Sequence, residues 1–172
     1  MSKRIAIVSN NSSNLLNFRG HLIKNLVDKK FNVLVITPKK DFSINFEKKI
    51  LELGAKISTI PLERTGMNPF QDITTYFSLK LLFDKFKPDI VLSYTSKPII
   101  YCGLVIGKND KINFFPNLTG LGYGFTDNFN FKRIIINFIL KIFFKFSFKS
   151  STAIIFQNPD DRLLFNNLKL TN

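Results

Sequence analysis

The chain has 172 residues, of which 45% are hydrophobic and 22% are charged, and these proportions exclude a disordered protein. A net charge of +13 predicts anionic partners: nucleic acid, an anionic membrane leaflet or a phosphorylated substrate. The single cysteine, Cys102, excludes an intrachain disulfide, so we expect a reducing compartment.

Short apolar runs alternate along the chain with longer segments of helical spacing. In chain order the pattern predicts a strand at 4–9, a helix at 18–29, a strand at 32–37, a helix at 42–53, a strand at 55–62, a helix at 69–86, a strand at 90–94, a helix at 99–106, a strand at 112–115, a helix at 131–148, a strand at 152–157 and a helix at 160–167. This order is typical of βαβ crossovers in a parallel sheet. We therefore predict an α/β fold, a Rossmann-like doubly wound parallel sheet of about six strands, as a single domain over residues 1–172.

Ligands of such a sheet bind outside the carboxyl ends of the strands, so the loops after the strands are the candidate site. The loop at 10–19 offers amide, hydroxyl and guanidinium groups, which suit sugar hydroxyls and phosphate oxygens. Asn and Ser also form plain turns and helix caps, so a structural role for this loop stays open. The candidate acceptor-binding residues here are Asn10, Asn11, Ser12, Ser13, Asn14 and Arg19.

The loops after the third, fourth and fifth strands add further candidates. An arginine beside a glycine can hold a phosphate or simply lie at a surface turn, and a lysine can neutralise a diphosphate. Glycines at alternate positions allow the backbone to approach a ligand closely. The candidates in these loops are Arg64, Thr95, Lys97, Thr119, Gly120 and Gly122.

Several motifs are missing from the sequence. The first loop has no Gly-x-Gly-x-x-Gly, which argues against a nicotinamide or flavin dehydrogenase, and no Walker A motif occurs. No Cys/His cluster is present, so we expect neither a metal nor another cofactor. The only histidine, His21, has no carboxylate beside it and is expected to be structural, which leaves the catalytic residues unassigned.

The expected helix at 131–148 is apolar around most of its circumference and carries lysines four residues apart. A wide apolar face edged by lysine is typical of a helix that lies on an anionic membrane. The alternative is a helix packed on the sheet with a solvated lysine face. No stretch reaches about 18 uninterrupted apolar residues, so no spanning helix is expected. The candidate membrane-surface residues are Lys141, Lys145 and Lys149.

From about residue 4 to its end, the chain resembles the N-terminal domain of glycosyltransferase family 4. The resemblance is carried by the segments 17–19, 33–38, 64–70, 87–91, 119–122 and 155–161. Within that family the chain looks like bacterial enzymes that extend lipid-linked sugars for O-antigen, capsule or protein glycosylation. The resemblance implies the N-terminal, acceptor-side half of a GT-B fold. Many relatives have a histidine near the position that Ser96 occupies here.

The resemblance also implies a retaining transfer from a nucleotide-sugar to a polyprenyl-diphosphate-linked sugar. The family's donor-binding domain has no counterpart in these residues, so we expect the chain to bind the acceptor and to be inactive without such a domain. The alternative is a non-catalytic membrane-docking subunit that recruits a separate donor-binding chain. Either protein would be cytoplasmic and peripheral on the inner face of the plasma membrane. Nucleic acid is not an expected partner, because the basic residues form no recognised motif or arm.

Overall fold

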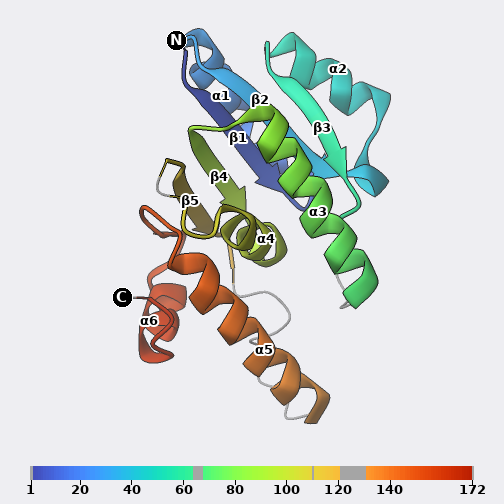
Figure 1. Ribbon diagram of the computed structural model, residues 1–172. Helices are drawn as coiled ribbons and strands as arrows, with labels where there is room; N and C mark the ends of the chain where they lie inside the picture. Colours follow the sequence, from blue (N-terminus) through green and yellow to red (C-terminus); the bar gives the residue numbers. More distant parts are fainter. Residues whose placement is uncertain (1, 64–67, 110, 121–130, 172) are drawn as a thin grey trace.

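A six-stranded, all-parallel sheet with helices on both faces organises the described residues, which are 2–63, 68–109, 111–120 and 131–171 of this computed structural model (Figure 1). The strand order is β3-β2-β1-β4-β5-β6. The strands are β1 (Arg4–Ser9), β2 (Asn32–Pro38), β3 (Lys56–Ile60), β4 (Ile90–Tyr94), β5 (Asn113–Leu118) and β6 (Ile155–Phe156). The helices are α1 (Ser12–Asp28), a 3-10 turn (Lys39–Asp41), α2 (Ile44–Glu52), α3 (Pro69–Phe86), α4 (Ser96–Ile106), α5 (Phe131–Phe148) and α6 (Pro159–Asn167). The predicted α/β fold is confirmed.

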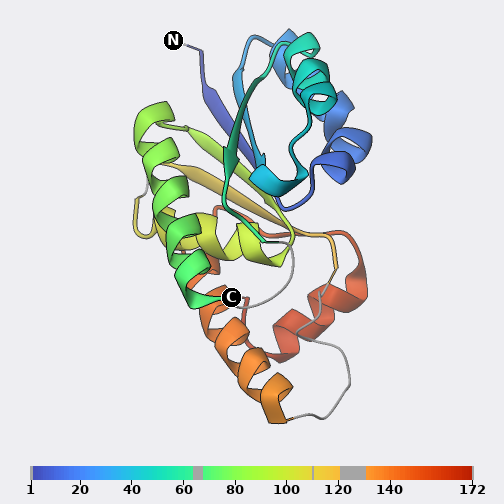
Figure 2. The same ribbon diagram turned by 90° about the vertical axis from the view of Figure 1, so that its right-hand side faces the viewer.

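The sheet is buried on both faces because its central strands are apolar at consecutive positions. Alternate residues of β1, such as Ile5 and Ile7, join a core cluster that contains α1 and α2 residues. The intervening residues, such as Ala6 and Val8, join a second cluster with α3 and α4 residues. Figure 2 shows α1 and α2 on one face of the sheet and α3, α4 and α5 toward the other.

The strand order reverses between β1 and β4, which are neighbours in the sheet although β2 and β3 intervene in the chain. After β1 the chain enters α1 on one face, and after β4 it enters α4 on the other. Diverging connections of this kind leave a crevice at the carboxyl ends of the two strands.

The helix α5 packs closely on α4. A Cβ atom added at Gly103 would lie only 2.4 Å from Ser147 Cα, so the two backbones approach as near as a glycine allows. The Ser147 hydroxyl donates to the Ile100 carbonyl at 3.0 Å. On the neighbouring side of α5, the Phe144 ring contacts the Phe165 ring of α6 edge-on, with centroids 5.3 Å apart. These contacts fix the inward face of α5.

Two helices begin three or more residues earlier in the chain than the sequence predicted. α1 begins at Ser12 instead of residue 18, because the Asn11 side chain caps it and accepts the backbone N–H of Asn14 at 2.7 Å. α4 begins at Ser96 instead of residue 99. At the other end of the sheet, β6 covers only Ile155–Phe156 of the strand predicted at 152–157. The predicted polar loop at 10–19 is therefore mostly the first turns of a helix.

Candidate functional site

A cavity of about 310 Å3 opens at the carboxyl ends of β1 and β4, where the strand order reverses. We call it the carboxyl-edge pocket. Its walls come from the start of α1, from the β4–α4 junction and from the segments that follow β5 and β6. It is lined by Ser9, Asn10, Asn11, Asn14, Leu15, Phe18, Arg19, Tyr94, Thr95, Thr119 and Gln157.

Arg19 brings a cation into this pocket. Its guanidinium carbon lies 4.7 Å from the centroid of the Tyr94 ring, a cation–π distance that fixes the otherwise flexible side chain. Burial raises the pKa of Tyr94, and the nearby Arg19 charge opposes that rise. Within the described part of the chain, no carboxylate lies within ion-pair distance of Arg19. The Arg19 guanidinium is therefore held beside the Tyr94 ring, and no carboxylate of the described residues neutralises its charge.

Thr95, which also lines the pocket, has an unusual backbone. Its φ of 72° and ψ of 163° put a β-branched residue in a region that favours glycine, at a cost of roughly 1–3 kcal/mol. Its Oγ1 atom is buried and has no hydrogen-bond partner among the residues that the structure describes. It also gives no side-chain cap to α4, whose first backbone N–H groups are free of helical partners by geometry. The wall thus combines an unsatisfied hydroxyl with the positive end of a helix dipole.

Lys97 is directed away from the carboxyl-edge pocket. Its ammonium lies 3.1 Å from the Asp72 carboxylate, with side-chain exposures of 17% and 29%. Burial and the hydrogen bond to Asp72 raise the pKa of Tyr101, one turn further along α4. This cluster of three residues joins the first turns of α3 and α4, and Lys97 is not part of the pocket lining.

The structure brings half of the twelve predicted acceptor-binding residues into one pocket. Those in its lining are Asn10, Asn11, Asn14, Arg19, Thr95 and Thr119. Ser12, Ser13, Lys97 and Gly120 are described but do not line it, and Ser12 is buried in the first turn of α1. Arg64 and Gly122 lie outside the described residues. A binding role for each of these residues stays a prediction.

Sequence reasoning missed five lining residues, Ser9, Leu15, Phe18, Tyr94 and Gln157. Ser9 and Tyr94 are the last residues of β1 and β4, so their place at the ends of apolar runs was an available signal. Phe18 remains 70% exposed although it lies on α1, which marks it as part of a surface. Gln157 follows β6, whose two-residue length hid where the strand ends.

The lysines predicted to face a membrane lie along α5. Lys145 and Lys149 are exposed and Lys141 is half-buried. With Arg162 and Lys169 of the α6 region, Lys145 and Lys149 line a cavity of about 610 Å3 that has no carboxylate in its lining. The Lys149 ammonium also lies 5.6 Å from the centroid of the exposed Phe146 ring. No helix within the described residues is long and apolar enough to cross a bilayer.

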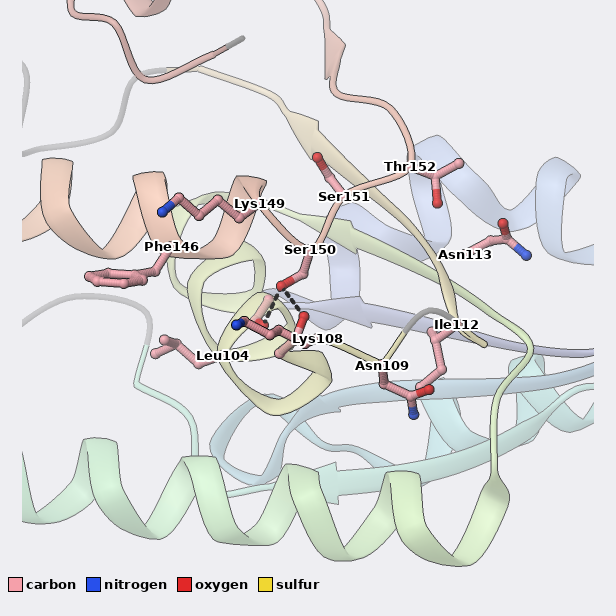
Figure 3. A pocket seen from close by; sticks show the side chains of 12 residues that line it. Leu104, Lys108, Asn109, Ile112, Asn113, Phe146, Lys149, Ser150, Ser151 and Thr152 are labelled. Carbon is pink, nitrogen blue, oxygen red and sulfur yellow. Dashed lines mark hydrogen bonds between the residues drawn. The ribbon is translucent and has the colours of Figure 1, made fainter.

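A larger cavity, of about 730 Å3, lies at the amino ends of β5 and β6, and we call it the amino-edge cavity (Figure 3). Two of its lining hydroxyl groups are hydrogen-bonded to backbone atoms. The Ser150 hydroxyl donates to the carbonyls of Gly103 at 3.2 Å and Gly107 at 2.5 Å. The Thr152 hydroxyl oxygen accepts the backbone N–H of Phe114 at 3.1 Å. In the described ranges, no group of three or more His, Cys, Asp or Glu residues could hold a metal ion at either cavity or elsewhere.

The parallel sheet and its carboxyl-edge pocket agree with comparisons to known proteins. A family model described as "Glycosyl transferase 4-like" matches residues 4–158. The chain belongs to this family. The resemblance found in the sequence is therefore confirmed, and it includes both strands that carry the walls of the pocket.

One relative of the family is the N,N'-diacetylbacillosaminyl-diphospho-undecaprenol alpha-1,3-N-acetylgalactosaminyltransferase of Campylobacter jejuni. It is 29% identical over 168 residues, which are 97% of this chain and 43% of the relative. The chain thus spans less than half the length of the curated relative that it matches.

Solved structures share the fold. A glycosyltransferase from Rickettsia africae has a TM-score of 0.64 at 16% identity, and the match covers 98% of this chain and 40% of that one. MurG of Acinetobacter baumannii has a TM-score of 0.61 at 13% identity, and the match covers 92% and 42%. These similarities confirm the expected GT-B-type, Rossmann-like fold.

Proposed function

We propose that this chain is the acceptor-binding domain of a glycosyltransferase that extends a polyprenyl-diphosphate-linked sugar. The acceptor's diphosphate and first sugar would lie in the carboxyl-edge pocket. The observation that carries the proposal is Arg19, a fixed guanidinium with no carboxylate partner in the described residues, which lines the same pocket as the strained and unsatisfied Thr95. A diphosphate can accept hydrogen bonds from both, and the adjoining N-terminus of α4 favours its negative charge.

The amide groups of the pocket suit the sugar. Asn10, Asn14 and Gln157 line it, and their side chains can both donate to and accept from sugar hydroxyls. Leu15 and Phe18 add apolar surface on which a sugar ring or the first lipid carbons can lie. The acceptor of the Campylobacter jejuni relative is named as a diphospho-undecaprenol-linked sugar, which is the chemistry proposed here.

We propose further that transfer needs a second, donor-binding lobe for the nucleotide-sugar, on the same polypeptide or on a partner chain. This proposal is supported by the length of the match, because the chain covers only 43% of the Campylobacter jejuni relative, which is named as a transferase. A retaining transfer is part of this proposal through the family resemblance. Mixing the chain with a separately expressed donor-binding lobe, a nucleotide-sugar and a lipid-linked acceptor should give turnover, whereas no turnover favours a non-catalytic docking subunit.

Calorimetric titration tests the acceptor site without any need for catalysis. The probe is a water-soluble, short-chain prenyl-diphosphate-linked N-acetylhexosamine, and the variants are Arg19→Ala and Arg162→Ala. Arg162 is an exposed arginine that lines the cavity between α5 and α6, so it controls for the loss of one positive charge. We expect Arg19→Ala to weaken binding about tenfold or more and Arg162→Ala to weaken it less than about twofold. Equal effects of the two variants would contradict the pocket assignment.

A second candidate function, docking on an anionic membrane through α5, is supported by the Lys145 and Lys149 side chains. Both are exposed, and neither lies within ion-pair distance of a carboxylate in the described chain. Flotation with phosphatidylglycerol vesicles should fall strongly when Lys141, Lys145 and Lys149 are changed to Glu, and 0.5 M salt should weaken the wild-type interaction. Unchanged flotation of the triple variant would eliminate α5 as the anchor.

A further inference from the structure

A carboxylate on α3 holds the beginning of α4. The Asp72 carboxylate accepts a hydrogen bond from the Lys97 ammonium at 3.1 Å and another from the Tyr101 hydroxyl, four residues further along α4. Residues four apart lie on the same side of a helix, so both donors of α4 reach one acceptor. We call Asp72, Lys97 and Tyr101 the Asp72 cluster. It fixes the first turns of α4 at two points, one turn apart.

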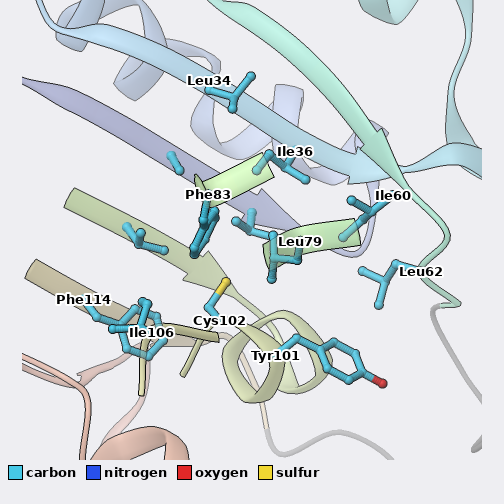
Figure 4. Packing of buried hydrophobic residues seen from close by; sticks show 13 residues of the cluster. Leu34, Ile36, Ile60, Leu62, Leu79, Phe83, Tyr101, Cys102, Ile106 and Phe114 are labelled. Carbon is cyan, nitrogen blue, oxygen red and sulfur yellow. The ribbon is translucent and has the colours of Figure 1, made fainter. Parts of the chain in front are cut away.

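The helix that carries Asp72 is itself anchored to the sheet. The Thr75 hydroxyl of α3 donates to the Pro61 carbonyl, which follows β3, at 2.6 Å. Further along α3, Leu79 and Phe83 are buried in the core cluster that also contains Tyr101 (Figure 4). Asp72 is therefore part of a rigid support, against which the start of α4 is held.

Thr95, two residues before Lys97, does not hold its own conformation. Its φ of 72° and ψ of 163° lie in a region that is populated almost only by glycine. Its hydroxyl has no partner in the described residues, and its N–H reaches the Asn117 carbonyl only at 3.4 Å. A strained conformation persists only where the structure on both sides of it is fixed. Before Thr95 the register of β4 with β1 and β5 does this, and after it the Asp72 cluster does.

We infer that Asp72 is a positioning residue, which holds Thr95 and the amino end of α4 in the arrangement that binds the acceptor. The inference deepens the proposed function and rests on it for the identity of the ligand. Without the ion pair to Lys97, Thr95 can relax to an ordinary φ. The apparent affinity then falls with the fraction of molecules that keep the strained arrangement.

The alternative is that Lys97 binds the diphosphate directly and Asp72 only masks its charge. The two accounts predict opposite signs for Asp72→Asn. Removing a negative charge that neutralises a ligand-binding lysine should strengthen the binding of an anion. Removing a carboxylate that positions Thr95 should weaken it. The structure favours the second account, because Lys97 does not line the carboxyl-edge pocket.

Calorimetric titration with the short-chain prenyl-diphosphate-linked N-acetylhexosamine decides the sign. Asp84→Asn is the matched control, because Asp84 lies on the same helix and its ion pair with Lys80, at 2.8 Å, does not reach α4. We expect Asp72→Asn to weaken binding about fivefold or more and Asp84→Asn to weaken it less than about twofold. Tighter or unchanged binding by Asp72→Asn would overturn the inference. Circular dichroism confirms that each variant is folded.

A double-mutant cycle separates positioning from a general loss of stability. Glycine adopts a positive φ without strain, so Thr95→Gly removes the need for Asp72 to hold the backbone. In the Thr95→Gly background, the further change Asp72→Asn should weaken binding by about twofold or less. A merely structural role of Asp72 predicts the same factor in both backgrounds, and that result would also overturn the inference.

Amide exchange measured by NMR without acceptor separates this inference from the proposed function. The Ile99 N–H donates to the Thr95 carbonyl at 3.1 Å, so its exchange rate reports on the junction of Thr95 with α4. We expect Asp72→Asn to speed this exchange about fivefold or more and Asp84→Asn to leave it unchanged. Unchanged exchange in Asp72→Asn would overturn the positioning role. Faster exchange, together with a wild type that binds no acceptor, would support the positioning role and contradict only the proposed function.

Discussion

The two edges of the sheet each carry a cavity, and the smaller one has the features of a binding site. At the carboxyl edge, about 310 Å3 of space is bordered by Arg19, which has no carboxylate partner in the described chain, and by the unsatisfied hydroxyl of Thr95. At the amino edge, about 730 Å3 is bordered by Ser150 and Thr152, whose hydroxyl groups are bonded to backbone atoms of α4 and β5. Volume alone would have selected the amino edge.

The difference lies in what the polar groups already do. A buried polar group that is hydrogen-bonded within the fold contributes to stability and has little to offer a ligand. A buried group without a partner in the fold is held at a cost to stability and is still free to bond to a ligand. Substitutions at the amino edge should therefore change stability, while substitutions at the carboxyl edge should change binding.

Gly103→Ala is expected to have the largest effect. The new Cβ would lie 2.4 Å from the backbone Cα of Ser147, so α4 and α5 must separate, at a cost of about 1–3 kcal/mol or more. Thermal unfolding should show a clear fall in Tm. Gly20→Ala is the control: its Cβ would meet only Leu16 Cδ1 at 3.8 Å, and alanine favours a helix, so Tm should hold or rise. Equal Tm values for the two variants would contradict the close α4–α5 packing.

A threonine-to-valine substitution at each edge of the sheet should distinguish an effect on binding from an effect on stability. Thr95→Val keeps the β-branched shape and removes a hydroxyl that has no partner in the described residues, so Tm should hold while affinity for the short-chain acceptor falls about tenfold. Thr152→Val removes the acceptor of the Phe114 N–H, so stability should fall by about 1 kcal/mol while affinity holds. The reverse pattern would assign the ligand to the amino edge.

Asp89→Asn is expected to have the smallest effect. The Asp89 carboxylate accepts from the Arg4 side chain and backbone at the start of β1, and these bonds hold the pKa of Asp89 below its ordinary value. A lowered pKa means that the stabilisation is present above about pH 4 and is lost as the pH falls through the folded-state pKa.

The Tm difference between wild type and Asp89→Asn should therefore be a few degrees at most at pH 7 and should shrink below about pH 4. Acceptor affinity at pH 7 should be unchanged, because Asp89 lies at the amino edge and outside the carboxyl-edge pocket. A Tm difference that grows in acid would contradict the Arg4–Asp89 interaction.

The sheet could be predicted from the sequence because its central strands β1 and β2 are buried on both faces and so are apolar at consecutive positions. The start of α1 could not, because the residues 10–14 are Asn and Ser, which favour turns, and it is the Asn11 cap that begins the helix at Ser12. The acidic partner of Lys97 was also hidden, since Asp72 lies on another helix and meets it only in the folded chain.

Half of the candidate site was predictable for a similar reason. Loops after parallel strands converge, so Asn10, Arg19 and Thr95 could be grouped from their positions alone. The stacking of Arg19 on Tyr94 joins α1 to β4 and forms only in the folded chain. The positive φ of Thr95 is a backbone property that cannot be predicted from the residue type. These two features distinguish a site from a polar loop, and only coordinates reveal them.

The central claim is that the acceptor binds in the carboxyl-edge pocket. Hydrogen–deuterium exchange with and without the short-chain acceptor tests it most directly, because one experiment measures backbone protection at both edges of the sheet. We expect slower exchange on binding in segments 10–19 and 94–97, at the carboxyl-edge pocket, and no change in segments 103–113 and 149–152, at the amino-edge cavity. Protection confined to the amino-edge segments, or no protection at saturating acceptor, would contradict the assignment.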